Sequence, residues 1–261
     1  MFSTVVPPAR KPRGVRPLVL LIVIVCVIAA GVLVRVSSRL GSALTMEARH
    51  GLVRATTAFN RPRPTTPLYV AIGASDSYGV GADNPTTQSW PAVLDSYLPP
   101  GTYFTNLGVP GIRLGRALAV ELPIAVDARP DLVTVWLAVN DLAAGVPLTV
   151  YRHQLDILLG TLQRRTHAHV LVANLPNLSL VPALAAQPGV AGTVAAWNAA
   201  IAAEADAHGA VLVDLYTQWT GLAVHPEDLG PDGLHPSTLG YRRLGELFWQ
   251  TYRLHWKDGT P

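Results

Sequence analysis

The chain has 261 residues, of which 49% are hydrophobic and 14% are charged, and this composition excludes a disordered protein. The formal net charge of +3 is unevenly divided. Residues 1–67 carry ten basic residues and one acidic residue, a formal +9, whereas residues 68–261 carry ten basic and 16 acidic residues, a formal −6. Because nucleic-acid binding needs a basic folded domain, this distribution predicts no nucleic-acid partner.

The first 35 residues predict a membrane anchor. Residues 1–16 contain four basic side chains, and residues 17–34 contain no charge. At ~1.5 Å per residue, a helix of this length just spans a hydrocarbon layer of about 30 Å. We therefore expect a basic cytoplasmic tail at 1–16 and a single-pass transmembrane signal anchor at 17–35, with the rest of the chain extracytoplasmic at the cell membrane. The alternative is a signal peptide that is cleaved to give a secreted protein.

Residues 36–67 are predicted to be a linker, because they end in a proline-rich stretch at 60–67 that favours extended chain. The folded domain is then expected at 68–261. The one cysteine, Cys26, lies in the apolar N-terminal segment. A single cysteine excludes an intrachain disulfide and a zinc site built on cysteines.

From residue 68 onward, short apolar runs alternate with helical patterns. Strands are predicted at 68–72, 103–107, 132–138, 170–173 and 211–214. Helices are predicted at 90–98, 114–126, 149–165, 193–207 and 238–254. This alternation predicts an α/β fold with right-handed crossovers and a parallel sheet. Because such sheets bind ligands at the carboxyl ends of their strands, the polar residues that follow each strand are candidate site residues.

Four segments meet this criterion. They are Gly73-Ala74-Ser75 after the first strand, the segment from Asn106 to Gly111 after the second, Asn140-Asp141 after the third, and the segment from Asp232 to His235 before the last helix. Each alone is compatible with a turn or a helix cap. Their common position, at strand ends and before the last helix, indicates a functional site.

The four segments resemble the motif blocks of the SGNH/GDSL hydrolase family. The first block normally reads Gly-Asp-Ser-x-x-x-Gly, and this chain has Ala74 in place of the aspartate. The third normally reads Gly-x-Asn-Asp, and here Ala138 replaces the glycine. The resemblance covers residues 68–261. It implies a flavodoxin-like three-layer α/β/α sandwich with a five-stranded parallel sheet.

The resemblance also implies a role for each motif residue. Ser75 would be the nucleophile, with His235 as its base and Asp232 as the group that orients His235. The oxyanion hole would be formed by the backbone N–H groups of Ser75 and Gly111 and the side chain of Asn140. The chemistry is consistent, because a serine hydroxyl needs a base to take its proton and imidazole titrates near neutral pH.

A second register is open for the nucleophile. Asp76-Ser77 followed by Gly81 also reads Asp-Ser-x-x-x-Gly. We favour Ser75, because Gly73 directly ends the apolar strand and places Ser75 in the turn. The expected outcome is that Ser75→Ala abolishes esterase activity and Ser77→Ala does not.

The sequence thus predicts an enzyme that hydrolyses a carboxylic ester through an acyl-serine intermediate, with no metal and no organic cofactor. The expected substrate is a small-molecule or glycan ester, either a lipid ester or an acetylated carbohydrate. Two alternatives are an extracytoplasmic acyltransferase acting on glycans and a catalytically inactive binding module of the same fold. A nucleotide-binding protein is disfavoured, because the first loop lacks a lysine and the spacing of a phosphate-binding loop. The sequence predicts no oligomeric state.

Overall fold

The structure is a computed structural model that describes residues 66–185, 189–219 and 225–256. The predicted cytoplasmic tail, signal anchor and nearly all of the linker lie outside the described residues. Among the helices that are described, none has the length and hydropathy to cross a membrane.

The centre of the fold is a five-stranded sheet in which every neighbouring pair of strands is parallel. The strands are β1 (Leu68–Gly73), β2 (Tyr103–Asn106), β3 (Leu132–Trp136), β4 (His169–Ala173) and β5 (Val211–Val213). Their order is β2-β1-β3-β4-β5. This is the flavodoxin-like order, and the chain reverses its direction of progress through the sheet between β1 and β3. The predicted parallel sheet and its five strands are confirmed.

The central strands are continuous apolar runs because both of their faces are covered. Every residue of β1 and of β3 is buried. Two polar side chains among them pair with each other: the Tyr69 hydroxyl and the Thr134 hydroxyl, on neighbouring strands, share a hydrogen bond of 2.9 Å. The sheet core is therefore apolar without unpaired hydroxyls at this position.

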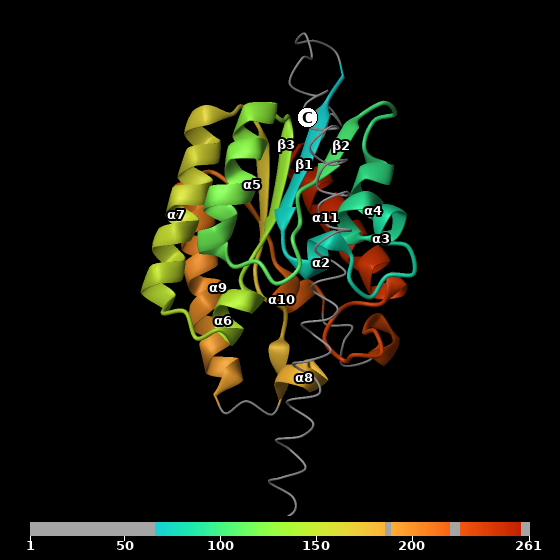
Figure 1. Ribbon diagram of the computed structural model, residues 1–261, viewed down its shortest axis with the longest axis vertical. Coiled ribbons are helices and arrows are strands. Elements are labelled where there is room, and N and C mark those ends of the chain that lie inside the picture. The colour runs from blue at the N-terminus through green and yellow to red at the C-terminus, as the bar shows by residue number, and fades with distance from the viewer. Residues whose placement is uncertain (1–65, 186–188, 220–224, 257–261) are drawn as a thin grey trace, which may run out of the picture. The chain divides into compact units, whose positions relative to one another are not determined.

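Helices cover both faces of the sheet, and together they confirm the three layers. The long helices are α4 (Trp90–Tyr97), α5 (Leu114–Ala128), α7 (Leu148–Arg165), α9 (Val190–Ala207) and α11 (Thr238–His255). Figure 1 shows α5, α7 and α9 on one side of the sheet and α4 with α11 on the other. All five were predicted, with differences of one to three residues at their ends.

The helices α4 and α11, which form the layer on one face of the sheet, pack closely although they are far apart in the chain. Trp90 of α4 stacks on Phe248 of α11 with ring centroids 4.0 Å apart, and both side chains are buried. Gly245 permits this approach, because a Cβ there would lie 2.6 Å from the side chain of Val93.

Several short helical elements were not predicted. They are α2 (Ser75–Tyr78), α3 (Pro85–Gln88), α6 (Val139–Ala143), η1 (Leu178–Leu180), α8 (Pro182–Ala185), α10 (Leu215–Gln218) and η3 (Pro226–Asp228). Three of them, α2, α6 and α10, begin within three residues of the ends of β1, β3 and β5, so they lie at the carboxyl edge of the sheet. Elements of three or four residues are too short to show a helical period in the sequence.

Candidate active site

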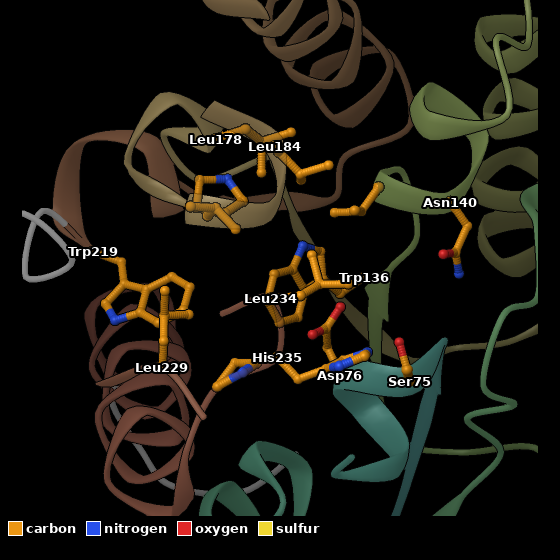
Figure 2. A pocket seen from close by; sticks show the side chains of 14 residues that line it. Ser75, Asp76, Trp136, Asn140, Leu178, Leu184, Trp219, Leu229, Leu234 and His235 are labelled. Carbon is orange, nitrogen blue, oxygen red and sulfur yellow. The ribbon is translucent and has the colours of Figure 1, made fainter. Parts of the chain in front are cut away.

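A pocket opens at the carboxyl edge of the sheet, where the sequence predicted a site (Figure 2). Its volume is about 490 Å³ when the open mouth is included. Four polar or ionisable side chains line it: Ser75, Asp76, Asn140 and His235. The other lining residues are Trp136, Val139, Pro176, Leu178, Val181, Leu184, Trp219, Leu229, Leu234 and Pro236. A mainly apolar hollow with a few convergent polar groups is the usual form of a small-molecule site.

Ser75 reaches the pocket because β1 ends at Gly73, two residues before it. It is the first residue of α2, so its backbone N–H has no acceptor within the helix. Figure 2 shows its hydroxyl pointing into the pocket. Ser77 faces the other way: it is fully buried, and a Cβ on Gly73 would lie 1.9 Å from its Oγ. Of these two serines, only Ser75 lines the pocket.

Asp232 and His235 form a hydrogen-bonded pair beside the pocket. His235 Nδ1 lies 2.6 Å from Asp232 Oδ2, and the backbone N–H of His235 donates to Asp232 Oδ1 at 3.0 Å. Although burial acts to raise it, hydrogen bonds from the His235 side chain and from the N–H groups of Leu234 and His235 hold the pKa of Asp232 below its ordinary value. A carboxylate can only accept, so Nδ1 carries the proton and Nε2 is left as an acceptor.

The loop that carries this pair is closed on itself. The N–H of Gly230 donates to the His235 carbonyl at 2.8 Å, and Leu229 and Pro236 form an isolated antiparallel bridge. The side chain of Ser237 then caps α11 by accepting from the N–H of Gly240. These contacts fix His235 just before a long, well-packed helix.

Ser75 and His235 line the same pocket, and no hydrogen bond joins their side chains within the described residues. In the described part of the chain, neither Ser75 Oγ nor His235 Nε2 makes a hydrogen bond. Figure 2 shows the side chains of Ser75, Asp76 and His235 next to one another on the same side of the pocket. Both atoms are therefore available to a bound substrate.

Asn140 lies on the opposite side of the pocket from His235, and its side chain points towards Ser75 (Figure 2). One of its two amide hydrogens is donated to the Ile112 carbonyl at 2.9 Å, which leaves the second one free for a ligand. This bond ties Asn140 to the exposed loop of Gly111, which is not itself a lining residue. No acceptor within the described residues takes the N–H of Gly111.

Asp141, the neighbour of Asn140, has a structural role. Its carboxylate accepts from the N–H of Leu114, the first residue of α5, at 2.9 Å. Burial raises the pKa of Asp141, while this N–H and the charge of Arg113 oppose the rise. The bond holds α6 against the start of α5 and so helps to fix the loop between Gly111 and α5.

Three features of the pocket were not found by sequence reasoning. Asp76 was considered only as part of the second nucleophile register, and Trp219 was not among the predicted site residues. The apolar wall from the segment after β4 was not predicted either; it consists of Leu178, Val181 and Leu184. A signal for Trp219 existed, because it follows β5 by a few residues and so lies at the carboxyl edge.

One cluster within the described residues has side chains placed as metal ligands are. Asp156, Glu204 and His208 bring one ligand atom each within 4.8 Å of one another, between α7 and α9. These groups are already engaged: Arg152 pairs with Glu204 at 2.6 Å, and His208 Nε2 lies 2.8 Å from Asp156. The cluster is accounted for as a polar clamp between two helices.

The parallel sheet and the pocket at its carboxyl edge define an α/β enzyme of flavodoxin-like topology. A model of the GDSL-like lipase/acylhydrolase family matches residues 71–243. The chain belongs to this family. It is therefore an enzyme that hydrolyses ester bonds. The resemblance found in the motif blocks is thereby confirmed.

Three solved structures illustrate the similarity in fold. TesA is 24% identical, with a TM-score of 0.58, and the match covers 72% of this chain and 98% of TesA. A lipase/acylhydrolase from Enterococcus faecalis is 20% identical, with a TM-score of 0.59 and coverage of 73% and 97%. The acetylxylan esterase Axe2 from Geobacillus stearothermophilus is 16% identical, with a TM-score of 0.58 and coverage of 71% and 93%. No curated protein sequence matches the chain.

Proposed function

We propose that the protein is a serine esterase that hydrolyses a carboxylic ester through an acyl-Ser75 intermediate. The observation that carries the proposal is the hydrogen-bonded Asp232–His235 pair beside the same pocket that Ser75 lines. Together, Ser75, His235 and Asp232 supply a nucleophile, its base and the group that orients the base, all at the carboxyl edge of the sheet.

In the first half of the reaction, His235 Nε2 takes the proton of Ser75 as Oγ bonds to the ester carbonyl carbon. The bond from that carbon to the alcohol oxygen then breaks, and the imidazolium gives its proton to the leaving alcohol. Asp232 keeps Nδ1 protonated and stabilises the imidazolium. In the second half, water replaces the alcohol and releases the acid by the same proton transfers.

The oxyanion formed in each half needs hydrogen-bond donors. The N–H of Ser75, the N–H of Gly111 and the second amide hydrogen of Asn140 are the proposed donors. Loss of one such donor typically lowers kcat by ~10²–10³.

The apolar wall supports an acyl group as the part of the substrate that the pocket binds. Each methylene group of the ligand that is buried against the leucine, valine and tryptophan side chains contributes about 0.8 kcal/mol to the free energy of binding. Similar structures include an acetylxylan esterase and a lipase/acylhydrolase, so a short acyl group on a sugar and a lipid ester are both represented. The extent of the wall favours an acyl chain of several carbons over acetate.

The decisive experiment compares Ser75→Ala with Ser77→Ala on p-nitrophenyl esters of increasing acyl length. We expect Ser75→Ala to abolish turnover and labelling by a fluorophosphonate probe, because the covalent intermediate cannot form. Ser77→Ala should retain both, since Ser77 faces the interior. The reverse pattern would move the nucleophile to Ser77. Absence of labelling in the wild-type protein would favour the binding-module alternative.

We also propose that residues 17–35 hold the enzyme at the membrane with its catalytic domain outside the cytoplasm. The support is the uncharged run at 17–34 between a basic tail and a proline-rich linker. A membrane-attached esterase would act on ester substrates at the cell surface.

A further inference from the structure

Asp76 is an acidic side chain in a pocket that otherwise suits an apolar ligand. It directly follows the nucleophile Ser75, and it lines the pocket together with ten residues whose side chains are apolar or aromatic. Figure 2 shows its carboxylate directed into the pocket beside Ser75. A ligand that fills the pocket therefore lies next to this carboxylate.

Among the residues that line the pocket, only His235 could carry a positive charge beside Asp76. The lining residues include neither arginine nor lysine. The ionisable groups that face Asp76 are His235 and Asp232 of the loop before α11 and the hydroxyl of Tyr241 on α11. His235 is engaged by Asp232 through Nδ1, and no hydrogen bond joins it to Asp76 within the described residues. The charge of Asp76 is thus left available to a ligand.

Asp76 is not a displaced copy of the aspartate that the family usually carries before its serine. Ala74 occupies that position, and its side chain is buried with the core at 6% exposure. Because side chains two residues apart on this turn face different surroundings, a carboxylate at 76 opens on the pocket instead. Its effect must therefore be exerted on what the pocket binds.

Burial raises the pKa of Asp76 to about 6, against the opposing charge of His235. The carboxylate is consequently ionised at mildly alkaline pH and neutral in mildly acidic solution. This titration offers an internal control, since acidification removes the charge without changing the side chain.

We propose that Asp76 is a specificity-determining residue that makes the pocket reject acyl groups with a carboxylate and favour acyl groups with an ammonium group. The inference rests on the proposed function, because it assigns the pocket to the acyl group. At the few ångströms that separate groups in one pocket, a charge is worth roughly tenfold in affinity or more, of either sign. An apolar wall alone would disfavour both charges equally.

The first test uses three p-nitrophenyl esters of similar length: hexanoate, 4-(trimethylammonio)butanoate and the monoester of glutarate. For the wild-type protein at pH 8 we expect kcat/KM for the ammonium ester to exceed that for the glutarate ester by roughly a hundredfold, ten from each charge. Asp76→Asn keeps the size and removes the charge, so the ratio should fall by at least tenfold. Asp83→Asn, which removes an exposed carboxylate from the loop that follows α2, is the matched control and should keep the wild-type ratio.

The second test measures binding of the three corresponding amides, which are inert, by calorimetry at pH 8 and pH 5. At pH 8 the wild-type protein should bind the ammonium amide more tightly than the carboxylate amide. At pH 5 this preference should fall to the level measured for Asp76→Asn. Binding does not depend on turnover, so this test also judges Asp76 if the wild-type protein hydrolyses none of the esters and the proposed function fails. An unchanged ranking in Asp76→Asn, in either test, would overturn the assignment.

Discussion

Glu121 is a buried carboxyl group placed behind the catalytic turn. It lies on α5 with 1% of its surface exposed. Burial raises its pKa to about 9, and the N–H groups of Gly73 and Val109 oppose this rise. Neither N–H makes a hydrogen bond of good geometry with the carboxyl group in the described residues. Glu121 is therefore neutral at physiological pH, next to the segments that lead to Ser75 and Gly111.

Replacement of Glu121 by glutamine should flatten the dependence of stability on pH. In the unfolded chain the carboxyl ionises near its ordinary pKa of 4.5, whereas in the folded protein it stays neutral up to about 9. The free energy of unfolding of the wild-type protein therefore falls as pH rises between these values. Glu121→Gln should be more stable by up to about 3 kcal/mol at pH 7.

Urea unfolding of both proteins between pH 4 and pH 9 measures this effect. At pH 4 the carboxyl group is largely neutral in both the folded and the unfolded state. The difference in free energy of unfolding between the two proteins then reflects mainly the replacement of a neutral carboxyl by an amide. A difference that stays constant across this range would contradict a neutral, buried Glu121.

At the scale of elements, the site depends on two loops that come into backbone contact. Gly81, shortly after α2, lies against the segment that carries His235. A Cβ on Gly81 would lie 2.6 Å from the Pro236 carbonyl oxygen, and its φ of +98° is itself unfavourable for other residues. The Tyr241 hydroxyl adds a hydrogen bond of 2.7 Å to the Val80 carbonyl. The positions of nucleophile and base thus depend on contacts between the segment after α2 and the segment around His235 and α11, which are far apart in the chain.

Gly81→Ala should consequently lower activity as well as stability. The added methyl group must displace the Pro236 backbone and, with it, His235, and a shift of about 1 Å can cost roughly a hundredfold in rate. Gly101→Ala is the matched control, because Gly101 has a similar φ of +88° but no atom within 4 Å of the added Cβ. Both variants should lose about 1 kcal/mol or more of stability from backbone strain.

Only Gly81→Ala should also lose kcat, measured on a p-nitrophenyl ester alongside urea unfolding. Equal kcat values in the two variants would show that the Gly81 contact does not position His235.

At the scale of the whole molecule, charge divides the chain into two parts of opposite sign. The first 67 residues carry a formal +9, and the remainder carries −6. The proposed anchor draws on only part of this positive charge: four of the ten basic residues stand in 1–16, the segment that the proposal places in the cytoplasm. The acidic domain would then be held away from an anionic lipid surface by a linker that favours extended chain.

We expect the full-length protein to stay in the membrane fraction after an alkaline carbonate wash. A variant that lacks residues 1–35 should be released, because it has lost the apolar run. Protease added to intact spheroplasts should digest the domain from outside. Recovery of a shortened protein from the medium would instead indicate signal-peptide cleavage.

Much of the fold follows from local patterns in the sequence. The buried strands and the long helices are each readable from apolar runs and helical periods, and their alternation determines the parallel sheet. The residues at strand ends, from Ser75 to Asn140, are predictable for the same reason, since parallel strands bring their carboxyl ends to one edge. The family follows from the same motif blocks.

Only the tertiary structure decides which of these atoms meet. The sequence offers Ser75 and Ser77 in similar contexts, and the packing of α2 turns one to the pocket and the other to the interior. Likewise Asp76 reads as part of a turn, and Trp219 as core, until segments after β1 and β5 come together around one pocket. The physical reason is that side-chain direction in a short irregular turn has no period, so contacts with segments far away in the chain determine it.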